Sequence, residues 1–160
     1  MTEVLAHDIL TRAREAGVTV TTAESCTGGM VAAALTDIPG SSDIFHRGMI
    51  TYSDAAKQEM LGVHAESLQV HGAVSEPVVV EMAEGARIAA SADIAVAVSG
   101  VAGPGGGTDL KPEGRVCFAL ATASGTQVET VDFGALGRAN VRAAATHHAL
   151  ELIRGALDVD

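Results

Sequence analysis

The feature that most constrains this chain is a short, continuous apolar run at residues 93–99, Asp-Ile-Ala-Val-Ala-Val-Ser. Its apolar residues follow one another without the alternation that marks a strand with one face in water. A run of this kind predicts a strand buried on both faces. Such strands occur in sheets with helices packed on each side, so this run favours an α/β architecture.

The rest of the chain alternates between β-branched runs and segments with apolar residues at helical spacing. A polar loop is expected after Leu61, and the Ser75-Glu76-Pro77 triplet opens a helix with a capping residue and an early proline. Helices are predicted at residues 3–16, 30–35, 54–61, 75–90 and 137–157, and strands at 18–23, 45–53, 93–99, 115–122 and 127–133. We therefore predict a three-layer α/β/α sandwich with a mostly parallel or mixed sheet, built as one domain over residues 1–160.

Composition excludes several classes of partner. The chain has 160 residues and a formal charge of −10, which removes the long-range attraction on which nucleic-acid binding relies. Cys26 and Cys117 lie far apart, and neither they nor the histidines have metal-ligand spacing. We expect reduced thiols, no signal peptide, no membrane span, no metal or other cofactor, and a cytoplasmic location. The sequence is compatible with a homo-oligomer and does not decide the oligomeric state.

The first segment with chemical character is Thr-Ala-Glu-Ser-Cys-Thr-Gly-Gly at residues 22–29, between a predicted strand and a predicted helix. Free N–H groups at a helix start favour anions, and glycines there let a ligand approach the backbone. Ser25 is followed by Cys26 and Thr27, so more polar groups cluster here than a helix cap requires. The alternative is that Ser25 is only a cap.

The second segment is Thr-Tyr-Ser-Asp-Ala-Ala-Lys at residues 51–57. Lys57 and Lys111 are the only lysines beside eight arginines, which suggests a need that arginine does not meet, such as losing a proton. Tyr52 is the sole tyrosine. The alternative is that Lys57 is a solvated helix residue and Tyr52 an ordinary strand aromatic.

The third segment is a glycine-rich loop, with Gly103 to Gly107 directly after the buried strand. Ligands of open α/β sheets bind at this end of the strands, and a glycine run can offer N–H groups to a phosphate or an oxyanion. The loop is neither a Walker loop nor a dinucleotide-binding fingerprint, and a flexible connection is the alternative. Arg138 and Arg142, four residues apart on the last helix, could clamp a phosphate or simply form a solvated face.

Together these motifs resemble the C-terminal domain family of the competence/damage-inducible protein CinA, whose stand-alone members are nicotinamide mononucleotide deamidases. The resemblance rests on residues 22–29, on Thr51-Tyr-Ser with Lys57, on residues 61–63 and 73–75, and on residues 99–108 with Lys111-Pro112. The chain departs from the family pattern at residues 111–115. The resemblance implies hydrolysis of the nicotinamide carboxamide to the acid and ammonia, with Ser25 as nucleophile, Lys57 as base and Tyr52 assisting.

The expected substrate-binding residues follow from the same motifs: Thr27, Gly28, Gly29, Gly105, Gly106, Gly107, Thr108, Lys111, Arg138 and Arg142. Amide hydrolysis without a metal needs an activated nucleophile and a stabilised oxyanion, and Lys57 must be desolvated or placed near a cation to act as base. N–H groups near Cys26 and Thr27, or those of Gly105 to Gly107, are candidates for the oxyanion hole, and the other set would hold the phosphate. Two alternatives stay open: a non-catalytic nucleotide-binding or regulatory module, and a hydrolase that uses the Cys26 thiol.

Overall fold

The computed structural model describes residues 1–158. Its centre is a five-stranded mixed sheet with the strand order β2-β1-β3-β4-β5. Strands β1, β2 and β3 are mutually parallel, whereas β4 is antiparallel to β3 and β5 is antiparallel to β4. The strands are β1 (Val20–Glu24), β2 (Phe45–Ile50), β3 (Ile94–Gly100), β4 (Arg115–Thr122) and β5 (Gly125–Asp132).

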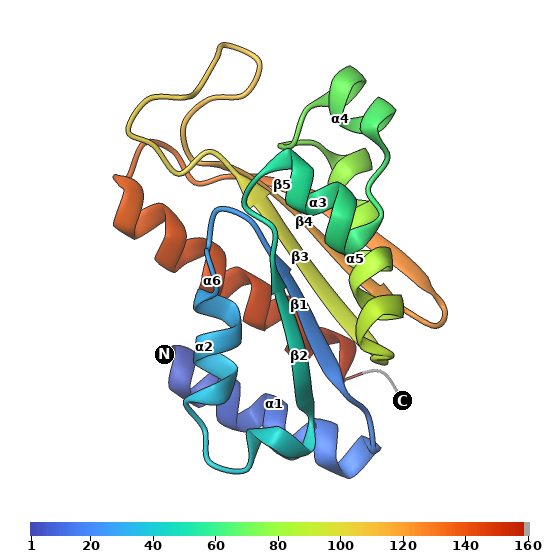
Figure 1. The fold of residues 1–160 in the computed structure, drawn as a ribbon. Helices are drawn as coiled ribbons and strands as arrows, with labels where there is room; N and C mark the ends of the chain where they lie inside the picture. Colours follow the sequence, from blue (N-terminus) through green and yellow to red (C-terminus); the bar gives the residue numbers. More distant parts are fainter. Residues whose placement is uncertain (159–160) are drawn as a thin grey trace.

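Helices cover both faces of this sheet, as Figure 1 shows. On one side, α2 (Met30–Thr36) and α6 (Arg138–Ala156) pack on the sheet and α1 (Thr2–Ala16) packs against both of them. On the other side, α5 (Glu76–Ala90) packs on the sheet, and α3 (Asp54–Leu61) and α4 (Ala65–His71) pack against α5. Each face has its own apolar core, centred on residues such as Ile9 and Phe118 on the first and Met82 on the second. The predicted α/β/α sandwich is therefore confirmed.

Strand β3 is the central buried strand that its sequence predicts. Its first six residues are buried, and their side chains alternate between the two cores, as with Val96 and Ala97. The predicted polar loop after Leu61 is partly wrong, because it contains the buried residue Val63 and the helix α4, whose one buried apolar residue is Leu68. A seven-residue helix with one buried anchor leaves too weak a periodic signal in the sequence.

The route of the chain creates a crevice at one edge of the sheet. After β1 the chain reaches β2 through α2 on one face, and after β2 it passes through α3, α4 and α5 on the other face to enter β3 beside β1. The strand order therefore reverses at β1, and in open α/β sheets ligands bind at such a reversal, outside the carboxyl ends of the strands. The segments singled out in the sequence follow β1, β2 and β3 at this edge.

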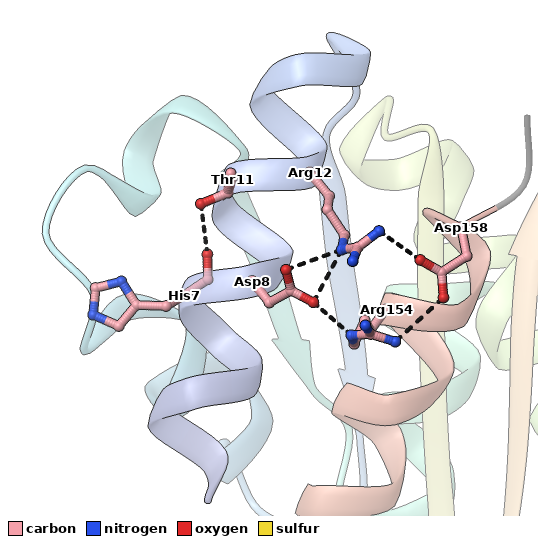
Figure 2. A network of polar contacts seen from close by, with 6 residues as sticks. All are labelled: His7, Asp8, Thr11, Arg12, Arg154 and Asp158. Carbon is pink, nitrogen blue, oxygen red and sulfur yellow. Dashed lines mark hydrogen bonds and ion pairs between the residues drawn. The ribbon is translucent and has the colours of Figure 1, made fainter.

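Helices α1 and α6 are also joined by an ion-pair network far from that edge (Figure 2). Asp8 pairs with Arg12 and Arg154, and Asp158 pairs with the same two arginines. The four side chains are between 33% and 43% exposed, so we expect the network to contribute little to stability. Within residues 1–158 no helix is both long and apolar enough to cross a membrane.

Candidate active site

The turn that follows β1 carries the predicted nucleophile. The Ser25 N–H donates to the Val98 carbonyl of β3 at 2.9 Å, which extends the β1–β3 ladder by one residue. The chain then turns through Cys26 and Thr27, with Gly28 and Gly29 both at positive φ, before α2 begins at Met30. Ser25 is 8% exposed, so its hydroxyl lies at the base of the crevice rather than on an open surface.

Helix α3 brings Lys57 to the same point. The Ser53 hydroxyl caps this helix by accepting from the Ala56 N–H, and the Lys57 side chain then extends inward. Lys57 Nζ lies 2.9 Å from Ser25 Oγ, 2.8 Å from the Thr51 carbonyl and 3.3 Å from the Tyr52 carbonyl.

Lys57 is 1% exposed, and this burial lowers the pKa of its ammonium group. Removal from water disfavours the charged form and lowers the pKa. This effect outweighs that of the nearby Asp54 carboxylate, which raises the pKa. The structure therefore places beside a serine hydroxyl a lysine that gives up its proton more readily than a solvated one.

A cavity of about 360 Å³ opens above this pair. Its floor contains Ser25, Cys26 and Lys57, and its walls come from the turn before α5, the end of β3, the glycine-rich loop and the start of α6. Besides the floor, the lining residues are Tyr52, Ala73, Val74, Ser99, Gly100, Val101, Ala102, Gly103, Pro104, Gly105, Gly106 and Arg138. This volume suits a small molecule.

Arg138 connects the two sides of the cavity mouth. It donates to the Gly103 carbonyl at 2.9 Å and to the Tyr52 hydroxyl at 2.8 Å. Tyr52 is 59% exposed, and its hydroxyl and its backbone carbonyl lie at different depths of the cavity. Its hydroxyl meets Arg138 at the rim, whereas its carbonyl meets Lys57 at the floor.

Comparisons with known proteins identify the family of this chain. A model of the CinA C-terminal domain matches residues 2–157. The chain belongs to the CinA C-terminal domain family. A relative from Escherichia coli (strain K12), named nicotinamide-nucleotide amidohydrolase PncC, is 57% identical over 137 residues, which cover 86% of this chain and 83% of the relative.

Larger proteins and solved structures share this family domain. A CinA-like protein from Synechococcus sp. (strain CC9902) is 52% identical over 153 residues, which are 95% of this chain and 36% of that protein. The crystal structure of the competence/damage inducible protein CihA from Agrobacterium tumefaciens has a TM-score of 0.95 and 45% identity, covering 99% of this chain and 96% of that one. A CinA superfamily protein from Klebsiella pneumoniae 700603 has a TM-score of 0.93 and 39% identity, covering 98% of each chain.

Four of the expected substrate-binding residues of this family member lie outside the cavity lining, three of them in the turn after β1 and the fourth, Arg142, on α6. Thr27 is fully buried, and its hydroxyl donates to Glu24 at 2.6 Å. Gly28 and Gly29 supply the positive φ angles of the turn, and a Cβ on Gly29 would lie 2.9 Å from Ile50. Arg142 donates to the carbonyls of Cys26 and Thr27, so it holds the turn from the side of α6.

Of the remaining expected substrate-binding residues, some line the cavity and others do not. Gly105, Gly106 and Arg138 line the cavity, whereas Gly107, Thr108 and Lys111 do not. Thr108 and Lys111 bond to each other in a turn, and the Lys111 ammonium donates to the His71 carbonyl at the end of α4. Lys111 therefore ties the loop to α4 in this structure.

Three residues of the site were missed by the sequence reasoning. Ser99 lines the cavity and donates to the Ala73 carbonyl, and Glu113 accepts from the Gly105 N–H at 2.5 Å, which orders the loop. Glu24 lies fully buried directly before the nucleophile. The signal for Glu24 was present in the sequence, since an acidic residue ends an otherwise uncharged strand.

The Cys26 thiol is a poorer nucleophile than its position suggests. Burial raises the pKa of this thiol to about 11, an effect that outweighs the nearby Arg142 charge. Only a thiolate attacks readily, so burial makes the Cys26 thiol less reactive than an ordinary cysteine.

Proposed function

We propose that this chain hydrolyses the carboxamide of nicotinamide mononucleotide to nicotinic acid mononucleotide and ammonia, with Ser25 as nucleophile and Lys57 as its base. The observation that carries this proposal is the 2.9 Å contact between Ser25 Oγ and the buried Lys57 Nζ on the floor of a small-molecule cavity. The name of the Escherichia coli relative, nicotinamide-nucleotide amidohydrolase, indicates the substrate. The reaction takes place in the cytoplasm and uses no metal.

The contacts of Lys57 suit a neutral amine. An uncharged amine has two N–H bonds and one lone pair, and Lys57 Nζ has three neighbours at hydrogen-bond distance. An ammonium donates to all three oxygens, whereas in the neutral form that the reaction requires the two N–H groups donate to the carbonyls of Thr51 and Tyr52 and the lone pair faces the Ser25 hydroxyl. In this arrangement Lys57 accepts the Ser25 proton as Oγ attacks the carboxamide carbon.

The remaining steps follow from the same groups. The Lys57 ammonium returns the proton to the leaving nitrogen, so ammonia departs and an ester links Ser25 to the nicotinoyl group. A water molecule, deprotonated by Lys57, then attacks this ester; Lys57 returns the proton to Ser25 Oγ, and the acid product leaves and loses its own proton to solvent. Both half-reactions balance in protons, because Lys57 takes one and gives one each time.

The Cys26 N–H is the best-supported donor for the oxyanion. It adjoins the nucleophile on the cavity floor, and it donates no hydrogen bond within residues 1–158. A backbone N–H in this position is a common source of oxyanion stabilisation in acyl transfer. The N–H of Ser25 itself is already bonded to Val98.

The phosphate of the substrate then belongs at the opposite wall. Arg138 is a charged side chain on the cavity rim, and the Gly106 N–H donates to no group among the described residues. A guanidinium and a free backbone N–H form a suitable anion site.

Ammonia release from nicotinamide mononucleotide and from nicotinamide riboside tests this assignment. Purified protein should turn over the mononucleotide, and the riboside, which lacks the phosphate, should show a KM raised about ten- to a hundredfold, as expected for loss of a charge-assisted contact. Arg138→Ala should reproduce this rise for the mononucleotide and leave the riboside unaffected. Equal KM values for the two substrates would contradict the phosphate site, and no ammonia from either would contradict the activity.

A further inference from the structure

Glu24 is a buried carboxylate beside the nucleophile that the mechanism above does not use. It is fully buried, and its side chain accepts three hydrogen bonds. The donors are the Thr27 hydroxyl at 2.6 Å, the Val31 N–H at 2.9 Å and the Ala32 N–H at 3.0 Å. Both carboxylate oxygens are therefore engaged within the protein, which is what a buried charge requires.

Two of these bonds place the carboxylate at the start of α2. The helix begins at Met30, and Gly29 before it has no side chain with which to cap the first turn. Glu24 supplies the missing cap from β1, because Val31 and Ala32 are among the first N–H groups of the helix. The favourable position for an anion at this helix start is thus filled by the chain's own carboxylate, and a substrate phosphate has no room for the same contacts.

The third bond closes the nucleophile turn. The Glu24 carboxylate holds Thr27 from within the core, while Arg142 holds the carbonyls of Cys26 and Thr27 from α6. The Ser25–Cys26 peptide lies in the chain between Glu24 and Thr27, the two residues that this third bond joins. Its N–H is the proposed oxyanion donor, so its orientation depends on how firmly the turn is held.

The backbone of Glu24 connects the turn to the base as well. The Thr51 N–H donates to the Glu24 carbonyl at 2.8 Å, and the Thr51 carbonyl in turn accepts from Lys57 Nζ at 2.8 Å. A shift of Glu24 would therefore move the nucleophile, the oxyanion donor and one acceptor of the lysine together.

We propose that Glu24 is a positioning residue for the reaction: its buried carboxylate holds the turn after β1 so that Ser25 Oγ and the Cys26 N–H keep their reactive geometry. This inference rests on the proposed function for the identity of the reaction. It also assigns the Thr27 hydroxyl to the support of the turn and not to contact with substrate.

The test compares two variants with one matched control. Glu24→Gln keeps the shape of the side chain but turns one acceptor oxygen into an N–H₂ group, which faces donors. Thr27→Val removes only the hydroxyl bond to Glu24. Thr22→Val is the control, because Thr22 is fully buried on the same strand two residues earlier and its hydroxyl has no partner within residues 1–158.

Two readouts separate positioning from binding and from folding. The first is kcat and KM for ammonia release from nicotinamide mononucleotide, and the second is the rate at which an aryl sulfonyl fluoride labels Ser25, followed by mass spectrometry. Far-ultraviolet circular dichroism establishes that each variant is folded. The labelling rate depends on the serine and its surroundings and needs no turnover of a nucleotide.

We expect kcat of Glu24→Gln to fall about ten- to a hundredfold, as for loss of a buried hydrogen bond to a charged group, with KM within about threefold of wild type. Thr27→Val should lose kcat by a smaller factor at unchanged KM, and Ser25 labelling should slow in parallel in both variants. Thr22→Val should match wild type in every readout.

Wild-type kcat and labelling rate in folded Glu24→Gln or in Thr27→Val would overturn the inference, and so would a rise in KM alone. If Glu24→Gln does not fold, Thr27→Val decides the matter by the same criteria. If the wild type releases no ammonia but Ser25 is labelled, the proposed function fails while the labelling rates of the variants still test Glu24.

Discussion

The Cys26 thiol adjoins the proposed nucleophile on the cavity floor, so its alkylation distinguishes a serine mechanism from a thiol mechanism. Burial raises the pKa of this thiol from an ordinary value of 9.0 to about 11. The difference of two pH units means that about one thiol in a thousand is ionised at pH 8, against about one in ten for an ordinary cysteine. Cys26 should therefore react slowly.

The expected rate follows from two opposing effects. The thiolate population is about a hundredfold smaller, while a thiolate of higher pKa is about eightfold more nucleophilic per molecule. These effects leave Cys26 about tenfold slower than a free cysteine at pH 8, and its 5% exposure slows it further.

Iodoacetamide labelling of Cys26, followed by mass spectrometry from pH 7 to pH 10, measures this rate against glutathione. A Cys117→Ala background removes the second thiol. The rate should rise about tenfold with each pH unit across the whole range, and Cys26→Ala should keep kcat within about threefold, because the backbone N–H stays in place. Labelling as fast as glutathione at pH 8, together with an inactive Cys26→Ala, would refute the reasoning and favour the thiol.

Three further predictions concern stability. Burial lowers the pKa of Lys57 from its ordinary value of 10.5, so the unfolded chain holds that proton more tightly than the folded chain does. The free energy of unfolding of the wild type, measured with urea, should therefore rise relative to that of Lys57→Met as the pH increases from the folded pKa towards 10.5. A Cβ at Gly85 would lie 1.9 Å from the Leu61 carbonyl oxygen, so Gly85→Ala should lower the free energy of unfolding by about 1–3 kcal/mol; an unchanged thermal midpoint would contradict this packing. Partial burial raises the pKa of Asp8, but its bonds to Arg154 and Arg12 outweigh this effect and lower the pKa. Asp8→Asn should therefore lower the free energy of unfolding by less than about 1 kcal/mol at pH 7. This loss should disappear as acid protonates Asp8, and it should shrink in high salt.

The architecture was predictable because its signals are local. The apolar run of β3 shows burial on both faces, and glycines or capping residues mark most helix ends, such as Gly17 after α1 and Ser53 before α3. Helix α4 was missed because one buried residue, Leu68, is its only apolar anchor. Periodicity does not detect an element of two turns with a single buried contact.

The site was predictable only in part. The rarity of Lys57 and the place of Ser25 between a strand and a helix pointed to both residues, and the structure brings the two side chains together. Sequence spacing did not distinguish the two arginines on α6, of which Arg138 faces the cavity and Arg142 holds the turn. Such assignments depend on tertiary contacts between residues that lie 35 to 116 positions apart in the chain, for which sequence spacing gives no direct signal.

The support of the nucleophile turn was the hardest part to predict. Thr27 has the residue type of a ligand-binding group, yet its hydroxyl faces inward to Glu24. A buried carboxylate that caps a helix from a neighbouring strand leaves no capping pattern, because Glu24 precedes the first turn by six residues. The positive φ angles in this turn explain why glycines stand there. The sequence alone does not distinguish this conformational requirement from a requirement for close approach of a ligand.

The central claim is that Ser25 and Lys57 together hydrolyse the carboxamide, and chelator-treated protein assayed for ammonia release from nicotinamide mononucleotide tests it most directly. We predict metal-independent turnover by the wild type, and loss of at least about a hundredfold in kcat for folded Ser25→Ala and for folded Lys57→Ala, with the nucleotide still bound by both. Turnover at the wild-type rate in either folded variant would contradict the account.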